Sequence, residues 1–193
     1  MPASTLSRPT VTSHLLAPVE PRYAPLFCFA LLTMSCALAS FAFACATPFA
    51  AFAVIAAAML PLQSALLVTV AAWLVNQGIG FGFLHYPVDA STILWGLVIG
   101  GAALAATAAS TAVLRVTART GTAVALSAAL IAAYAAYELV LFAATPFLGG
   151  AEDFSKAIVG RLGLLSVLWL IGLFAVCEMV RLLNSARQHR AAS

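Results

Sequence analysis

Three side chains that could bind a ligand lie together in one apolar stretch of the chain. Trp73, Asn76 and Gln77 are spaced by three and four residues, which places all three on one face of a helix. Amide groups cost free energy in hydrocarbon unless they are hydrogen-bonded, so this face should point to the interior of a helix bundle or to a wet cavity. The same pattern is typical of plain helix packing, and both interpretations stay open.

A second group of the same kind lies later in the chain. Tyr134, Tyr137 and Glu138 again share one helix face. An ionised glutamate within a membrane should find a partner, and Arg161 is the nearest candidate by depth. We therefore expect both groups to line one pocket that opens to the outside. The residues predicted to line it are Trp73, Asn76, Gln77, Tyr134, Tyr137, Glu138 and Arg161. The alternative is a structural ion pair between Glu138 and Arg161 that locks two helices together.

Enzyme chemistry finds little support in the sequence. The four cysteines contain no Cys-x-x-Cys pair and are most simply small apolar side chains. His85 has no second histidine within one helical turn, so no metal site is expected there. The Gly-Ile-Gly-Phe-Gly run lacks the preceding strand and the following Lys-Ser/Thr of a nucleotide-binding loop. We expect a protein that is not an enzyme and that needs no cofactor or metal.

The composition indicates a membrane protein. Of the 193 residues, 64% are hydrophobic and only 8% are charged, and the mean hydropathy is +1.07. So much apolar surface cannot be buried in one soluble core, so the lipid bilayer must solvate it. The net charge of +3 does not indicate a nucleic-acid partner, because the basic residues are dispersed around hydrophobic segments and form no basic face.

Six hydrophobic runs predict an all-α membrane bundle of six transmembrane helices with a short second helix. The runs cover approximately residues 25–46, 48–60, 63–84, 91–114, 121–145 and 157–183. Crossing the hydrocarbon takes about 20 apolar residues, so the second run is short. Pro48 and Pro61 bracket this run, and prolines mark helix boundaries. The short run could be a tilted half-span that other helices shelter.

The basic residues predict which side of the membrane each end of the bundle faces. With six crossings that start in the cytoplasm, seven of the nine basic residues fall on the cytoplasmic side, as the positive-inside rule requires. These seven are Arg8, Arg22, Arg115, Arg119, Arg181, Arg187 and Arg190, and the two left outside are Lys156 and Arg161. We therefore expect a disordered cytoplasmic tail over residues 1–24, a membrane domain over 25–183 and a basic cytoplasmic tail over 184–193.

The end of the first hydrophobic run allows a second interpretation of the N-terminal region. Ala42, Phe43 and Ala44 resemble a signal-peptide cleavage site, and Cys45 follows as it would in a lipoprotein. The leading region is long for a signal peptide, and Phe43 fits the lipid-attachment pattern badly. We therefore expect this segment to remain in the mature protein as its first helix.

These features together resemble the substrate-binding S components of energy-coupling-factor transporters. The resemblance covers residues 25–183 and rests on the six helices with cytoplasmic ends, the short second run TPFAAFAVIAAAMLPL and the outward-facing pocket. It implies capture of a vitamin or similar micronutrient, with a coupling subunit and ATPases supplying the energy. In that family an Ala-x-x-x-Ala pattern on the first helix contacts the coupling subunit. The corresponding positions here are Ala42 with Ala46, and a looser small-residue stripe of Cys36, Ser40 and Ala44.

A non-transporting structural or assembly subunit of a membrane complex is the competing hypothesis. It rests on pairs of small residues one turn apart, which suit tight helix packing within one chain or between chains. These pairs are Gly96 with Gly100 and Ala105 with Ala109. Under both hypotheses we expect the protein to cross the bacterial inner membrane several times.

Overall fold

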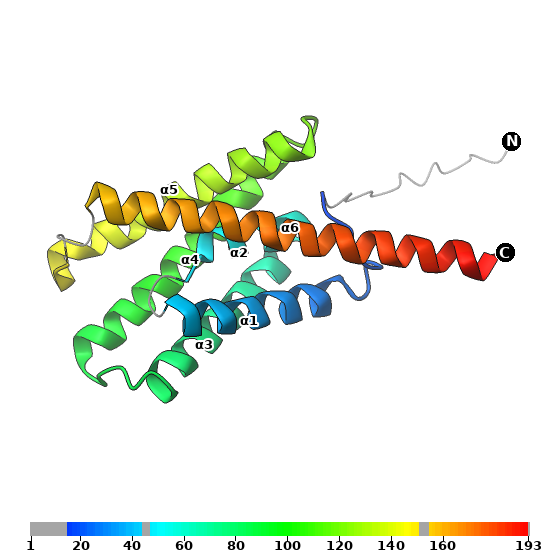
Figure 1. Ribbon diagram of the computed structural model, residues 1–193. Helices are drawn as coiled ribbons and strands as arrows, with labels where there is room; N and C mark the ends of the chain where they lie inside the picture. Colours follow the sequence, from blue (N-terminus) through cyan, green and yellow to red (C-terminus); the bar gives the residue numbers. More distant parts are fainter. Residues whose placement is uncertain (1–14, 44–46, 151–154, 193) are drawn as a thin grey trace, which may run out of the picture.

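The computed structural model describes residues 15–43, 47–150 and 155–192. These residues form six α-helices and no strand, which confirms the predicted all-α bundle (Figure 1). The helices are α1 (Ala24–Phe43), α2 (Phe49–Met59), α3 (Leu62–Gly82), α4 (Ala90–Val116), α5 (Thr122–Leu148) and α6 (Lys156–Ala192). Successive helices run in opposite directions, so the chain passes back and forth through the bundle (Figure 1).

Prolines set both ends of the short helix α2. Pro48 stands directly before its first residue, a position where the missing N–H of proline costs no helical hydrogen bond. Leu60 has an extended backbone (φ −130°, ψ 152°), which is the conformation that a following proline favours. The helix therefore stops at Met59, and α3 begins directly behind Pro61. The predicted boundaries of the short second run are confirmed.

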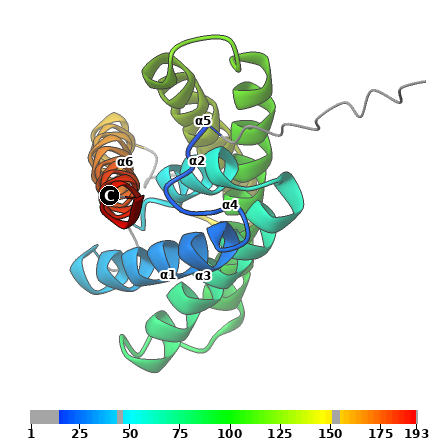
Figure 2. The same cartoon turned by 90° about the vertical axis from the view of Figure 1, so that its right-hand side faces the viewer.

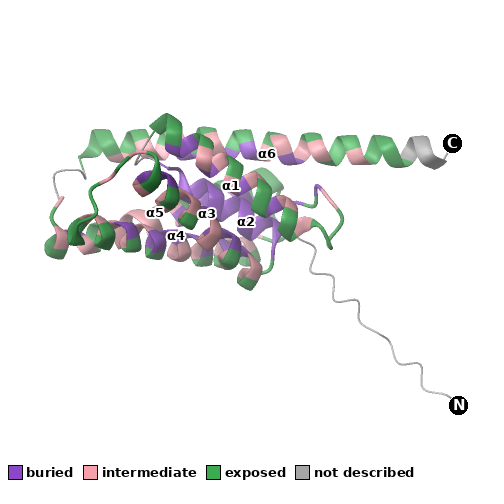
Figure 3. Cartoon of the chain, turned by 90° about the horizontal axis from the view of Figure 1, so that it is seen from below, coloured by how far each residue is buried: buried purple, intermediate pink, exposed green. Residues whose placement is uncertain are grey.

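The helix α2 is the core of the bundle. All of its 11 residues are buried, and it contacts each of the other five helices. In an end-on view it lies inside a ring of these helices (Figure 2), and the buried residues gather around it (Figure 3). A helix that is apolar on all sides requires such surroundings. At about 1.5 Å per residue α2 is roughly 16 Å long, about half the hydrocarbon thickness, so it is a half-span that its neighbours shelter.

The other five helices are long and apolar enough to cross a membrane. Their most apolar windows have mean hydropathies between 1.5 and 2.2, yet at most 33% of each window is buried inside the bundle. The remaining apolar surface needs an apolar solvent, which a lipid bilayer provides. The chain is therefore a multi-spanning helical membrane protein.

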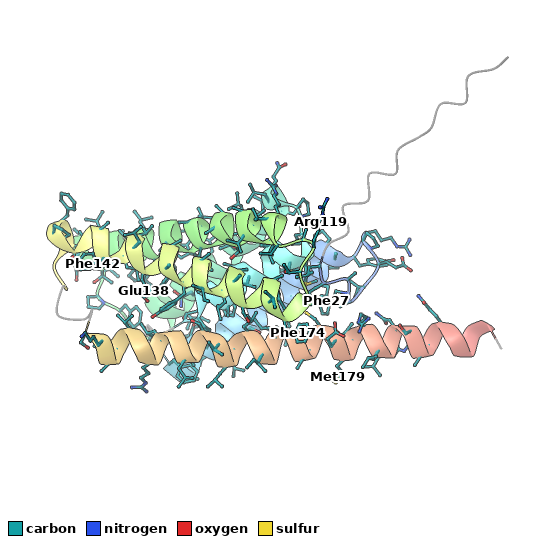
Figure 4. All side chains as sticks on the ribbon, turned by 90° about the horizontal axis from the view of Figure 1, so that it is seen from above. Phe27, Arg119, Glu138, Phe142, Phe174 and Met179 are labelled. Atoms are coloured by element: carbon teal, nitrogen blue, oxygen red, sulfur yellow. The ribbon has the colours of Figure 1, made fainter. Side chains whose placement is uncertain are left out.

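The N-terminal segment, the α4–α5 connection and the C-terminal part of α6 lie at one end of the bundle (Figure 1), which we call the basic end. Leu16 donates its N–H to the carbonyl oxygen of Ala58 at 3.1 Å, near the end of α2. The side chain of Asn184 donates to the carbonyl oxygen of Pro18 at 3.0 Å. Arg119 of the α4–α5 connection lies at this end as well (Figure 4). The basic segments thus gather as the charge pattern predicts, and the opposite end is called the far end below.

The two predicted tails need corrected boundaries. A disordered tail over residues 1–24 is wrong for residues 15–23, because the apolar Leu16 is buried against the core and is only 4% exposed. Residues 1–14 lie outside the described part of the chain. The predicted tail over 184–193 continues as helix to Ala192, since no proline or glycine interrupts α6 in this region.

Reporter fusions test which side of the membrane the basic end faces. The positive-inside rule predicts the cytoplasm, so fusions after Leu60 and after Arg119 should give cytoplasmic signals and a fusion after Gly149 a periplasmic one. The fusion after Leu60 tests whether the short α2 returns the chain to the basic end. Green fluorescent protein and alkaline phosphatase at the same positions report the two sides with opposite signals. Phosphatase activity from a fusion after Arg119 would contradict this topology.

Candidate functional site

A cavity of about 350 Å³ lies at the far end of the bundle, between α2, α4, α5 and α6. Its volume is at the low end of the range for small-molecule sites, about 300–1,000 Å³. Its polar lining is Thr47, Tyr134, Tyr137, Glu138 and Ser166. The first residues of α2 also line it, because this short helix begins at Phe49 and leaves space beyond its N-terminus between the longer helices.

Glu138 supplies the carboxyl group of the cavity. It lies on the side of α5 that faces α6 (Figure 4). Its Oε1 atom is buried and has no hydrogen-bond partner among the described residues. Buried polar atoms in folded proteins are almost always hydrogen-bonded, and leaving one without a partner costs free energy. The carboxyl group among the lining residues therefore has one oxygen without a donor in the described part of the chain.

The predicted pair between Glu138 and Arg161 is wrong. The ion pairs in the described part of the chain lie elsewhere, and Arg161 is exposed in a groove between α1 and α6. Val159 and Leu162, on either side of Arg161 in the sequence, line the cavity instead. The position of Arg161 around the α6 axis places its side chain in this separate groove and not in the cavity that Glu138 lines.

Tyr134 and Tyr137 line the cavity together with Glu138, as the sequence predicts for these three residues. The hydroxyl of Tyr134 donates to the carbonyl oxygen of Val159 at 2.6 Å and thereby joins α5 to α6. The ring of Tyr137 stacks on Phe49 of α2, with 6.3 Å between the ring centroids. Their part in ligand binding stays a prediction.

The amide side chains of Asn76 and Gln77, predicted to line the same pocket as Glu138, do not line the main cavity. Asn76 joins α3 to α1 and to the α1–α2 connection. Asn76 donates through Nδ2 to the hydroxyl oxygens of Ser40, at 2.9 Å, and of Thr47, at 3.0 Å. Gln77 donates through Nε2 to Oδ1 of Asn76 at 3.2 Å. Neighbouring side chains thus provide the hydrogen bonds that buried amides need. The prediction that Asn76 faces the glutamate of α5 across one pocket is wrong.

Trp73 and Gln77 pack into hollows on the surface of α4. Trp73 donates through Nε1 to the carbonyl oxygen of Gly96 at 2.8 Å, and its ring would lie 2.8 Å from a Cβ atom at Gly100. The Oε1 atom of Gln77 would lie 2.5 Å from a Cβ atom at Gly96. These two glycines therefore serve packing within this chain. For Trp73, Asn76 and Gln77 these contacts favour the packing interpretation.

Phe49, Trp95 and Ile99 form the wall between the two groups of predicted site residues. They line both the main cavity and a smaller one of about 120 Å³ that reaches Asn76. Thr47 connects the two sides, since it accepts a hydrogen bond from Asn76 and lines the main cavity. Sequence reasoning missed Phe49 and Trp95 as lining residues, although both lie at the outer end of their runs, at the depth predicted for the pocket.

The small-residue stripe predicted to contact a coupling subunit is largely unavailable. Cys36 and Ser40 are 0% and 1% exposed, and Cys36 donates through its thiol to a backbone carbonyl of α3 at 3.1 Å. They pack α1 against α3, so the prediction that they contact a separate subunit is wrong. Ala42 is exposed near the end of α1, whereas Ala44 and Ala46 lie outside the described residues.

The groups in the cavity suit noncovalent binding of a small molecule. The lining combines aromatic and aliphatic side chains with one carboxyl group and several hydroxyl groups, which is the usual construction of a small-molecule site. Within the described residues, no three His, Cys, Asp or Glu side chains gather closely enough to hold a metal ion. Comparisons of the chain with protein-family models, with curated protein sequences and with solved structures find no match.

Proposed function

We propose that this chain is an integral membrane subunit that binds a small solute for uptake. The observation that carries this proposal is the cavity at the far end, whose lining includes Glu138, a carboxyl group with one buried oxygen that has no donor among the described residues. Side chains that only pack helices together are expected to satisfy such an atom, as they do for Asn76. Under the positive-inside rule the far end faces the outside, where a solute would be captured.

The sequence contains no nucleotide-binding loop, so uptake against a gradient would need either an ion gradient or an energised partner. We propose that a separate energising module, a coupling subunit with ATPases, supplies the energy in the bacterial inner (plasma) membrane. This arrangement follows the resemblance to the S components of energy-coupling-factor transporters. The solute is then a vitamin or a similar micronutrient.

A structural or assembly subunit of a membrane complex is the second candidate function. The packing role of Trp73, Asn76 and Gln77 favours it, because that role removes three predicted residues from the cavity. In addition, α6 extends beyond the bundle at the basic end (Figure 1), and Leu182 and Leu183 of this helix are exposed. Neighbouring genes distinguish the two functions: genes for ATPases and a coupling subunit favour uptake, and genes for a large membrane complex favour the structural role.

Filling the cavity should abolish ligand binding while the protein stays folded. Leu162 lines the cavity from α6, so Leu162→Trp places a large ring there. Leu164→Trp makes the same change on a side chain that is 60% exposed on the outside of the bundle. In a thermal-shift screen against water-soluble vitamins and related micronutrients, a ligand should stabilise the wild type and Leu164→Trp but not Leu162→Trp. At a free concentration of about 100 times its Kd, a ligand stabilises the native state by about 2.7 kcal/mol.

The unliganded melting temperatures of the two variants provide the folding control for this screen. If a compound stabilises all three proteins equally, it binds outside the cavity, and the proposed site is incorrect. If no compound stabilises the folded wild-type protein, the uptake function loses its support and the structural subunit becomes the better explanation.

A further inference from the structure

We infer that the cavity accepts a small protonated amine, with its ammonium group at Glu138 and its carbon skeleton against the aromatic side chains. This inference rests on the proposed binding function and adds the chemical class of the ligand. Three properties of the lining carry it: the hydrogen-bonding positions that remain open, the sign of the charge, and the aromatic walls.

Three of the polar side chains in the lining present acceptors to the cavity. Tyr134 donates its hydroxyl proton to the carbonyl oxygen of Val159 at 2.6 Å, and Ser166 donates its own to the carbonyl oxygen of Leu162 at 3.0 Å. A hydroxyl group that has donated its one proton can still accept. The carboxyl group of Glu138 is a further acceptor, and its Oε1 atom has no donor among the described residues. The cavity thus presents lone pairs from α5 and α6.

A cavity lined by hydrogen-bond acceptors favours a ligand that carries hydrogen-bond donors. An ammonium group brings three N–H donors and no acceptor, so it matches these positions without placing lone pairs against lone pairs. A hydrogen bond from a cationic N–H group to a carboxylate is about twice as strong as a bond between neutral groups. An amine therefore gains more from this lining than an alcohol of the same shape.

The charged group in the lining is acidic, which suits a cationic ligand. Glu138 supplies a carboxyl group, and no Lys, Arg or His is among the described residues that line the cavity. Arg161 is exposed in a separate groove. The N-terminal end of α2, where Phe49 and Ala50 line the cavity, carries only about half a positive charge, which is less than the full charge of a carboxylate. A ligand with one positive charge would neutralise the remaining negative charge of the Glu138 carboxylate.

Aromatic side chains from three helices surround the remaining space. Phe49 of α2, Trp95 of α4, and Tyr134 and Tyr137 of α5 all line the cavity. Aromatic faces attract a cation that lies within about 6 Å of the ring centroid, and they also cover apolar carbon. The cavity volume of about 350 Å³ restricts the ligand to a single ring or a short chain.

Matched pairs of amines and alcohols test the charge preference at nearly constant shape. The pairs are phenethylamine with phenethyl alcohol, pentylamine with pentanol, and choline with its neutral tert-butyl analogue. Choline has no N–H donor, so it separates attraction by the aromatic rings from hydrogen bonding to Glu138. Isothermal titration and thermal shift on the full-length protein in detergent measure binding. We expect at least one primary amine to bind, and its alcohol to bind at least about 10-fold more weakly.

Three variants locate the effect. Glu138→Gln keeps the size of the side chain but removes its charge, and it should weaken amine binding by about 10- to 100-fold while leaving the alcohols unchanged. Glu178→Gln removes an acidic group at the basic end, where Glu178 pairs with Arg181 at 2.9 Å, and it controls for general attraction of cations. Trp95→Leu removes an aromatic wall and should weaken choline more than its neutral analogue. If Glu138→Gln does not fold, Trp95→Leu tests the preference of the cavity for a cation.

The outcomes separate this inference from the function on which it rests. Alcohols that bind as tightly as their amines would overturn it, and so would amine binding that Glu138→Gln leaves unchanged or the absence of binding by every amine. If a neutral or anionic micronutrient then stabilises the wild type but not Leu162→Trp, the cavity is a binding site for another class of ligand. If no compound of any charge binds the folded protein, the binding function fails together with the inference.

Discussion

Replacing Phe52 by alanine should destabilise the protein by about 3–5 kcal/mol, the range for truncating a buried phenylalanine. Phe52 lies within α2, its side chain is 0% exposed, and α2 contacts every other helix. Lipid is as apolar as a phenylalanine ring, so the loss comes mainly from packing contacts that the resulting void cannot replace. Because α2 packs against all five other helices, the effect should spread to the whole bundle.

Phe147→Ala is the matched control for this prediction. Phe147 lies near the end of α5 and is 86% exposed, so the same change should alter the free energy of unfolding by no more than about 0.5 kcal/mol. Thermal or detergent-induced unfolding, followed by circular dichroism, measures both variants. Equal losses at Phe52 and Phe147 would show that α2 is not the core of the bundle.

Gly100→Ala should cost about 1–3 kcal/mol, although alanine is the better helix former of the two. The added Cβ atom would lie 2.8 Å from the ring of Trp73. That ring cannot retreat freely, because its Nε1 atom donates to the carbonyl oxygen of Gly96 at 2.8 Å. The adjacent Gly101 has no atom within 4 Å of the same added Cβ. Gly101→Ala should therefore be neutral or stabilising by up to about 1 kcal/mol.

The two adjacent glycines thus test the contact between α3 and α4 with one chemical change. The same unfolding measurement applies, and a loss of stability is expected for Gly100→Ala but not for Gly101→Ala. Destabilisation of equal size at both positions would contradict the close approach of Trp73 to α4. Since Trp73 does not line the main cavity, Gly100→Ala should also leave the affinity of the folded protein for its ligand unchanged.

The length of α2 connects the stability of the bundle to its cavity. A helix of about 16 Å fills only roughly half of the depth that the surrounding helices span. At the far end, beyond the first residue of α2, Phe49, the helices α4, α5 and α6 have no central helix to pack against, and the cavity lies there. The prolines at positions 48 and 61 set the ends of α2 and thereby the place of the cavity, and Pro48 also lines it.

The order, the number and nearly all of the boundaries of the helices could be predicted from the sequence because they depend on local properties. Continuous apolar runs define the spans, and Pro48 and Pro61 interrupt them on both sides of α2. The gathering of the basic segments at one end follows from the alternation of helix direction. Tyr134, Tyr137 and Glu138 could also be found, because their spacing places them on one face of one helix.

The rotation of each helix about its own axis depends on contacts between segments that are far apart in the sequence. Periodicity shows that Asn76 and Gln77 share a face, but it does not show which neighbour that face meets. Packing turns Asn76 toward hydroxyl acceptors on α1 and on the α1–α2 connection, because a buried amide without acceptors would cost free energy. Packing likewise turns Arg161 away from Glu138 and brings aromatic rings of α2 and α4 next to that carboxylate. The cavity is thus a property of four helices packed together, and no single run of the sequence contains it.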